Sequence, residues 1–303
     1  MAQRLKLARF AWLSILTAVL TIVLKVAAYW LTNSVGLLSD AIESSANLIA
    51  AGVALIVLII AAQPPDEEHA YGHAKAEYFS SGVEGTLVLL AAAAIVWSAA
   101  HRLAEPELLD QLDVGLLVSV VAAGLNLLTG RVLQRAGRRY RSVTLTADAH
   151  HLMADVWTTA GVIVGVLAVR VTGIQMLDPL IALAVAARII YTGALLVHTA
   201  VQGLMDTALP ADEQSKIRQV LATYAGDGVQ FHALRTRQSG AQRFMSVHIQ
   251  VPGAWSVARG HSLLEDLERD VRRALDPITV FTHLEPLEDP RSWEDISIYR
   301  EEG

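Results

Sequence analysis

Six long apolar stretches fill about the first 200 residues of the chain, and they constrain its fold more than any other feature. They cover residues 10–31, 35–62, 79–103, 113–135, 145–170 and 178–202. A helix of about 20 apolar residues crosses the hydrocarbon core of a bilayer. The sequence therefore predicts a bundle of six transmembrane helices within residues 1–205.

Charged residues are distributed unevenly, and their distribution divides the chain. They make up 18% of it, whereas a soluble protein usually carries about 25%. Residues 206–290 nevertheless have the composition of a soluble domain, and residues 291–303 form a C-terminal tail. The chain has no cysteine, which excludes disulfide bonds and thiolate metal sites. Its net charge of -6 does not favour a nucleic-acid partner.

Basic residues indicate how the bundle is oriented. The first apolar stretch is too long for the core of a signal peptide and has no clear cleavage pattern, so we expect a retained helix. Arg4, Lys6 and Arg9 precede it, and five arginines lie between residues 131 and 141. Because basic loops stay in the cytosol, we expect a multi-pass protein of the inner membrane with both termini cytosolic.

Two of the apolar stretches carry the same pattern of polar residues. The matched pairs in the second and fifth stretches are Asp40 and Asp148, Glu43 and His151, and Asn47 and Asp155. Positions i, i+3 and i+7 share one face of a helix, and ionisable groups inside a membrane are costly and usually functional. Two such faces supply four ligands to a divalent ion: Glu43, Asn47, His151 and Asp155.

The alternative for these residues is hydrogen bonding between helices, which is common in membrane bundles. His150 lies about 100° around the helix from His151, and its role stays open. Asp40 and Asp148 lie nearer to a helix end, where each can line an access path or bond to neighbouring backbone.

Five short segments in a fixed order make the chain resemble the cation diffusion facilitator family. They are LTNSVGLLSD at 31–40, HAYGHAKAE at 69–77, LMDTALP at 204–210, LRTRQSG at 234–240 and THLEP at 282–286. Within the family, the resemblance is strongest to the bacterial zinc/iron exporters. It implies a six-helix transmembrane bundle, a C-terminal α+β metallochaperone-like (ferredoxin-like) domain and a homodimer. Relatives usually carry Asp or His and then Asp where this chain has Glu43 and Asn47.

The segment after the second apolar stretch contains a further group of potential ligands. Asp66, His69 and His73 can converge on one ion, and their mixed nitrogen and oxygen shell suits zinc. The resemblance also implies a second metal site here. The alternative is a solvated loop that caps a helix.

We expect the soluble domain to contain two helices and three strands. The helices span residues 211–224 and 256–275, and the strands span 229–237, 243–251 and 278–284. The first two strands alternate around Ser239-Gly240, which is typical of a hairpin.

The soluble domain is also rich in histidine. The potential ligands are His232, His248, His261, His283 and Glu285. Each histidine alone is more often a surface or core residue, but the resemblance implies that this cluster binds two metal ions and joins the soluble domains of a dimer. It also implies a hinge ion pair between Lys75 and Asp206, whose alternative is an ordinary surface salt bridge.

These features predict a proton-coupled exporter of divalent transition-metal ions that works by alternating access. Zn²⁺ and Fe²⁺ come first as substrate and regulator, and cobalt, manganese and cadmium remain possible. The main alternative is a membrane-anchored metal sensor that does not transport. A channel would need a continuous polar pore, and an intramembrane metalloprotease would need a motif such as H-E-x-x-H, so we expect no enzyme.

Overall fold

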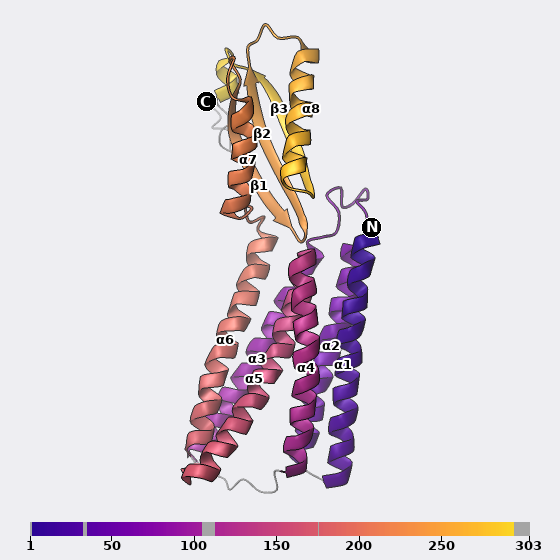
Figure 1. Ribbon diagram of the computed structural model, residues 1–303, viewed down its shortest axis with the longest axis vertical. Coiled ribbons are helices and arrows are strands. Elements are labelled where there is room, and N and C mark those ends of the chain that lie inside the picture. Colours follow the sequence, from indigo (N-terminus) through magenta and orange to yellow (C-terminus); the bar gives the residue numbers. More distant parts are fainter. Residues whose placement is uncertain (1, 33–34, 105–112, 175, 294–303) are drawn as a thin grey trace. The chain divides into compact units, whose positions relative to one another are not determined.

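The structure is a computed structural model that describes residues 2–32, 35–104, 113–174 and 176–293 (Figure 1). Within these ranges some residues are described by their backbone alone, including residues 35–43 and 45–47. The chain separates into two compact units, Met1–Leu204 and Met205–Gly303. Each unit is described by itself below.

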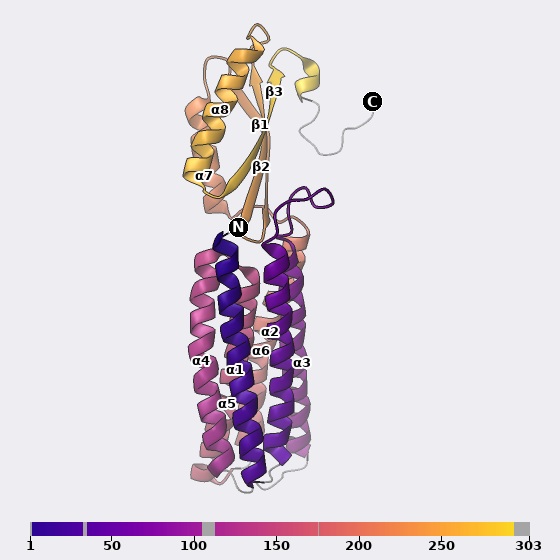
Figure 2. The same ribbon diagram turned by 90° about the vertical axis from the view of Figure 1, so that its right-hand side faces the viewer.

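The described part of the first unit is built from long helices that run alongside one another (Figures 1 and 2). They are α1 (Ala2–Thr32), α2 (Val35–Ala61), α3 (Ala76–Ala104), α4 (Asp113–Tyr140), α5 (Val143–Thr172) and α6 (Leu177–Leu204). The most extensive pairings join α3 to α6, α1 to α2 and α4 to α5.

Four of these helices are long and apolar enough to cross a membrane. The stretches that qualify among the described residues are Leu7–Ala28, Ala76–His101, Leu117–Tyr140 and Pro179–Leu204. Helix α2 contributes the shorter apolar stretch Leu48–Ala61, and α5 carries several polar residues. Membrane crossing by α2 and α5 therefore stays a prediction.

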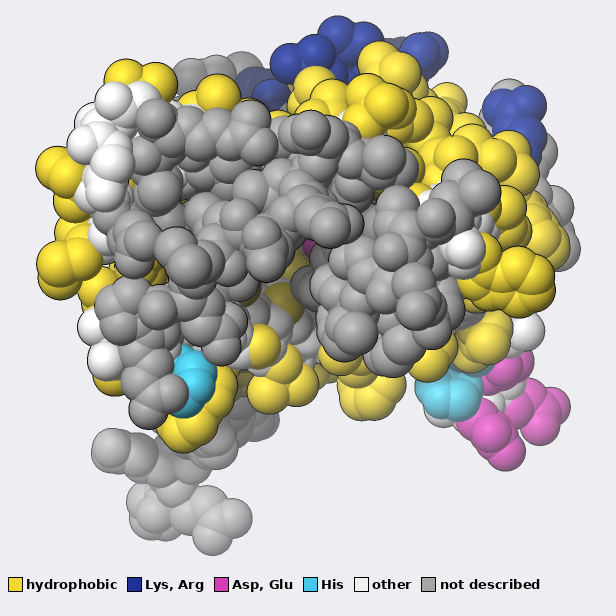
Figure 3. All heavy atoms as spheres, turned by 90° about the horizontal axis from the view of Figure 1, so that it is seen from below, with side chains coloured by type: hydrophobic (Ala, Val, Ile, Leu, Met, Phe, Trp, Pro, Cys, Tyr) yellow, Lys and Arg dark blue, Asp and Glu magenta, His cyan; other side chains and the backbone are white. Residues whose placement is uncertain are grey.

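The outer surface of the first unit is apolar, as expected of helices that contact lipid. Trp30 is 82% exposed and Trp97 is 79% exposed. Figure 3, which looks onto the ends of the helices, shows hydrophobic side chains around the described part of the surface. Small residues allow the helices to approach closely inside. A Cβ atom on Gly203 of α6 would overlap the ring of Tyr78 on α3.

The start of α5 is attached to α3 by a buried carboxylate. Glu77 of α3 accepts hydrogen bonds from the Ser142 hydroxyl and from the backbone N–H of Thr144. The first N–H groups of a helix have no partner within the helix and carry partial positive charge. Glu77 therefore satisfies the helix end and holds the first turns of α3 and α5 beside each other.

The second unit is a three-stranded sheet with two helices. Its elements are α7 (Ala211–Tyr224), β1 (Gln230–Ser239), β2 (Gln242–Val251), α8 (Val257–Ala274), β3 (Ile278–Pro286) and the 3-10 helix η1 (Pro290–Trp293). The strand order is β1-β2-β3, with β1 antiparallel and β3 parallel to β2. This order of elements matches the prediction, and the last strand extends two residues beyond the predicted end.

The two faces of this sheet differ in chemistry. Residues on one face, including Met245, Val247 and Ile249 of β2, form an apolar core with Ile217 of α7 and Leu267 of α8. Figure 2 shows both helices on that side of the sheet. Because side chains alternate along a strand, the residues between them point to the opposite face, where no long helix of the described part packs.

Candidate metal centres

The face of the sheet away from the two helices carries a row of histidines across all three strands. His232 of β1 pairs with His248 of β2, and His248 pairs with His283 of β3. Neighbouring strands lie about 4.8 Å apart, so the register alone brings these imidazoles together. Glu285 follows His283 by two residues and therefore shares its face.

Glu285 lies at the centre of this cluster. Its Oε2 atom is 2.8 Å from His232 Nε2, and its Oε1 atom is 3.0 Å from His248 Nδ1. His283 Nε2 is 3.5 Å from the same Oε1 atom. Ligand atoms of His232, His248 and Glu285 all lie within 4.8 Å of one another. Mixed imidazole and carboxylate donors at this spacing suit a divalent transition metal such as zinc.

The residues of the cluster differ in their access to solvent. The side chains of His232 and Glu285 are 10% and 7% exposed, whereas His283 is 65% exposed. Trp293 of η1 lies against His232, with 6.0 Å between ring centroids, and its indole N–H donates to the Leu287 carbonyl. The described start of the predicted tail therefore packs against the histidine face.

His261 is the one expected member that the described structure places elsewhere. It lies on α8, its side chain is 69% exposed, and Glu265 of the same helix is 3.9 Å away. Because α8 packs on the opposite face of the sheet, His261 does not join His232, His248 and Glu285 within one chain.

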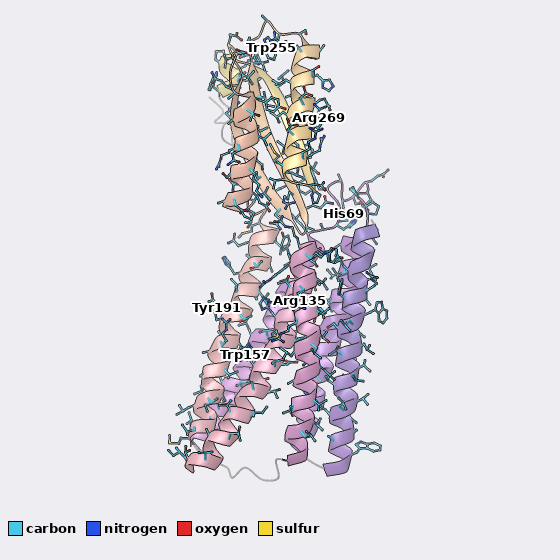
Figure 4. The ribbon with its side chains drawn as sticks, in the orientation of Figure 1. His69, Arg135, Trp157, Tyr191, Trp255 and Arg269 are labelled. Atoms are coloured by element: carbon cyan, nitrogen blue, oxygen red, sulfur yellow. The ribbon has the colours of Figure 1, made fainter. Side chains whose placement is uncertain are left out.

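A second group of ligands forms in the segment between α2 and α3 (Figure 4). Asp66 Oδ1 is 3.3 Å from His69 Nδ1, and Asp66 Oδ2 is 3.2 Å from His73 Nε2. The ligand atoms of the three residues lie within 4.8 Å of one another. Gly72, with a φ of +80°, turns the chain between the two histidines.

Local backbone geometry keeps the Asp66 carboxylate charged. The backbone N–H of His69 donates to Asp66 Oδ1 over 2.6 Å. This hydrogen bond is the main reason why the pKa of Asp66 is lowered from its ordinary value, and the nearby charge of His73 contributes further. A carboxylate that stays ionised is available to a cation, since a metal ligand must be deprotonated.

Half of the expected membrane site can be placed in the structure. His151 is buried on α5, and Asp155 follows it by one helical turn. The side chains of Asp40, Glu43 and Asn47 on α2 lie outside the described residues. Their arrangement toward α5 therefore stays a prediction.

Two further residues on α5 have neighbours from other helices. Asp148 accepts a hydrogen bond from Ser14 of α1 over 3.0 Å, as expected of a polar residue that joins helices. The charged neighbours of His150 include Arg138 and Arg188. Two cations disfavour a metal ion beside His150.

Asn126 of α4 was not singled out in the sequence, although it contacts an expected ligand. Its amide Nδ2 donates to Asp155 Oδ2 over 3.1 Å, and the side chain is 7% exposed. A hydrogen bond of this kind orients a ligating carboxylate. The available signal was a polar amide within an otherwise apolar stretch.

The residues of the expected hinge ion pair belong to different units. Within the first unit, Lys75 Nζ donates to the Leu204 carbonyl over 3.4 Å. Within the second, Asp206 Oδ1 accepts from Arg237 over 3.2 Å. An ion pair between Lys75 and Asp206 stays a prediction.

Known families match both units. The cation efflux transmembrane domain matches residues 11–205, and the cytoplasmic domain of cation efflux proteins matches residues 209–287. These two domains define a membrane protein for cation efflux with a cytoplasmic metal-binding domain. The chain belongs to the cation diffusion facilitator family.

Individual relatives cover nearly the whole chain. An uncharacterised transporter of Synechocystis sp. is 48% identical over 290 residues, which are 95% of this chain and 94% of that protein. Cation-efflux pumps FieF of Pectobacterium atrosepticum and Serratia proteamaculans are 32% and 33% identical, with 89% of each chain covered. The metal-bound C-terminal domain of the CzcD transporter from Thermotoga maritima is 30% identical, covering 26% of this chain and 92% of that one, with a TM-score of 0.25.

Proposed function

We propose that this protein exports divalent transition-metal ions across the inner membrane in exchange for protons, as a homodimer that alternates its access. The observation that carries the proposal is the pair His151 and Asp155, one turn apart on α5, with Asp155 held by Asn126 of α4. Polar ligands within the membrane unit serve transport, whereas a sensor needs only the ligands outside the membrane.

The transport ligands are Glu43, Asn47, His151 and Asp155. The ion binds them from the cytosolic side, and the helices then rearrange to open the site to the other side of the membrane. Protons arriving there compete for the ionisable ligands and release the metal. Asn47 cannot titrate, so this chain exchanges fewer protons per ion than a relative with four ionisable ligands.

The choice of metal follows from the donors. One imidazole and three oxygens leave zinc, ferrous iron, cobalt, manganese and cadmium as substrates, since affinity alone does not set selectivity. The histidines outside the membrane favour zinc. We rank Zn²⁺ and Fe²⁺ first.

The soluble cluster serves regulation in this proposal. The position of His261 on the opposite face from His232 and Glu285 supports a role between chains, because one chain cannot use all these ligands on one ion. Cytosolic metal would then join the two soluble domains and favour the transporting dimer, and the ion pair of Lys75 with Asp206 would act as the pivot.

Uptake into proteoliposomes under a pH gradient tests the proposal. Zinc, iron, cobalt and manganese are compared for the native protein, Asp155→Ala and the matched pair His151→Ala and His150→Ala. We expect uptake that requires the gradient, is lost in Asp155→Ala and His151→Ala, and persists in His150→Ala.

The competing function is a membrane-anchored sensor, which the two clusters outside the apolar helices favour. Metal binding to those clusters without uptake of any of the four ions would establish the sensor and reject the exporter.

A further inference from the structure

Two buried carboxyl groups in the membrane unit have incomplete hydrogen bonding. Glu84 of α3 is 1% exposed and Asp148 of α5 is 3% exposed. Ser80 donates to Glu84 Oε1 over 3.4 Å, and Ser14 donates to Asp148 Oδ1 over 3.0 Å. The second oxygen of each group, Glu84 Oε2 and Asp148 Oδ2, is buried without a hydrogen-bond partner among the described residues.

The helical register places this pair beside the transport ligands. Glu77 of α3 accepts a hydrogen bond from the N–H of Thr144 on α5, and both helices start at the same end of the unit (Figure 1). Glu84 and His151 each follow these positions by seven residues, a rise of about 10 Å. Glu84 therefore lies at the depth of His151, and Asp148 lies about one turn closer to the start of α5. The two carboxyl groups are close enough for their charges to interact.

Two neighbouring carboxylates in an apolar bundle need compensating charge. A buried charge without a partner costs several kcal/mol, and within a membrane such groups are paired, hydrated or neutralised. No lysine or arginine in the described part of the chain forms an ion pair with Glu84 or Asp148. On α5, His151 is close enough to Asp148 for their charges to interact. Glu84 has no such partner among the described residues, so it must be protonated or contact a bound cation.

Oxygen donors at this place suit a divalent ion. Carboxylate and hydroxyl oxygens are hard ligands that bind divalent metals. The Ser81 hydroxyl, one turn before Glu84 on α3, is also fully buried without a hydrogen-bond partner among the described residues. The unpaired oxygens of Glu84, Asp148 and Ser81 are the kind of donors that a cation would use.

We propose that Glu84 and Asp148 form a second cation site in the membrane unit, which a divalent ion occupies beside the transport ligands as it passes in from the cytosol. The inference rests on the proposed function for the direction of passage, but binding at the site does not depend on transport. Relatives usually carry a carboxylate at the position of Asn47. In this chain, Glu84 on α3 supplies a carboxylate near the transport ligands instead.

Carbodiimide labelling tests the site in the full-length protein. Dicyclohexylcarbodiimide reacts with protonated carboxyl groups in apolar surroundings, and mass spectrometry locates the product. We expect labelling of Glu84 in metal-free protein and protection by Zn²⁺. Protection is expected to be lost in Asp148→Asn and to persist in Asp155→Ala, which removes a transport ligand.

Two results would overturn the site. Labelling that Zn²⁺ does not change would mean that the pair holds protons only. Protection lost in Asp155→Ala but kept in Asp148→Asn would mean that metal at the transport ligands shields Glu84 indirectly.

A second readout covers the case in which the reagent does not reach Glu84. The zinc content per chain after gel filtration is compared for Glu84→Gln and for Thr86→Val, a matched control on α3 whose hydroxyl donates to its own helix. We expect a lower content in Glu84→Gln only, and equal contents would reject the site. Uptake is measured in parallel. If the native protein takes up no metal, the exporter is rejected. The labelling and zinc results then still decide whether the site exists.

Discussion

At the scale of single residues, the hydrogen bond between Asn126 and Asp155 orients a carboxylate that we propose as a transport ligand. A carboxylate can bind metal through either oxygen, and its orientation is free unless a neighbour restrains it. Asn126 restrains Asp155 Oδ2 over 3.1 Å from a different helix. Residues of this kind affect a metal site without touching the ion.

Replacing Asn126 by leucine should therefore weaken metal binding. Loss of a partner of this kind typically costs about 10- to 100-fold in affinity or activity, and we expect an effect in that range on metal affinity and on uptake. The matched control on α4 is Thr129→Val, which removes a hydrogen bond to Thr17 of α1 instead. Isothermal titration of both variants checks this, and equal affinities would contradict a role for Asn126.

At the scale of elements, a tyrosine on α7 connects the two helices that cover the sheet. Tyr224 donates its hydroxyl proton to Asp270 Oδ2 of α8 over 2.7 Å. Burial, the hydrogen bond to Asp270 and the charge of Asp270 raise the pKa of Tyr224 from 10.0 to about 12. The folded state thus retains a proton that the unfolded state releases first.

This pKa predicts a loss of stability at high pH. The contribution of Tyr224 is complete below pH 10, and it falls as the pH rises from 10 to about 12 because only the unfolded state then loses its proton. After allowance for solvent screening, we expect at most about 1 kcal/mol. Urea unfolding of residues 205–303 at several pH values checks this. Tyr224→Phe should show a shallower decline, and identical declines would contradict the account.

At the scale of the whole molecule, potential metal ligands occur in both units. A ligand that binds only the folded state stabilises that state, by about 2.7 kcal/mol at a concentration 100 times its dissociation constant. The cluster around Glu285 belongs to the second unit, which has its own apolar core. Zinc bound there should stabilise this unit without a matching effect on the helices of the first.

Hydrogen exchange in the full-length protein tests this separation. We expect zinc to slow exchange in β1, β2 and β3, and Glu285→Gln to abolish that effect. Glu265→Gln, on the exposed surface of α8, is the matched control and should retain it. If zinc slowed exchange in Glu285→Gln as much as in the native protein, zinc would act at another site.

Much of this protein follows from local patterns in its sequence. Apolar stretches of membrane length, the alternation of residues 243–251 and the one-turn spacing of His151 and Asp155 are properties of neighbouring residues. They therefore predict helices, strands and which residues share a face. The loop from Asp66 to His73 is short, so its potential ligands are close in space because they are close in sequence.

Only the tertiary structure decided which distant residues meet. His232, His248 and Glu285 converge because strand pairing places them in one row, whereas His261 is on a helix behind the other face of the sheet. Asn126 reaches Asp155, and Glu84 comes close enough to Asp148 for their charges to interact, because of how the helices pack. Periodicity shows which side of a helix is polar, but the neighbour opposite that side depends on packing across the whole bundle.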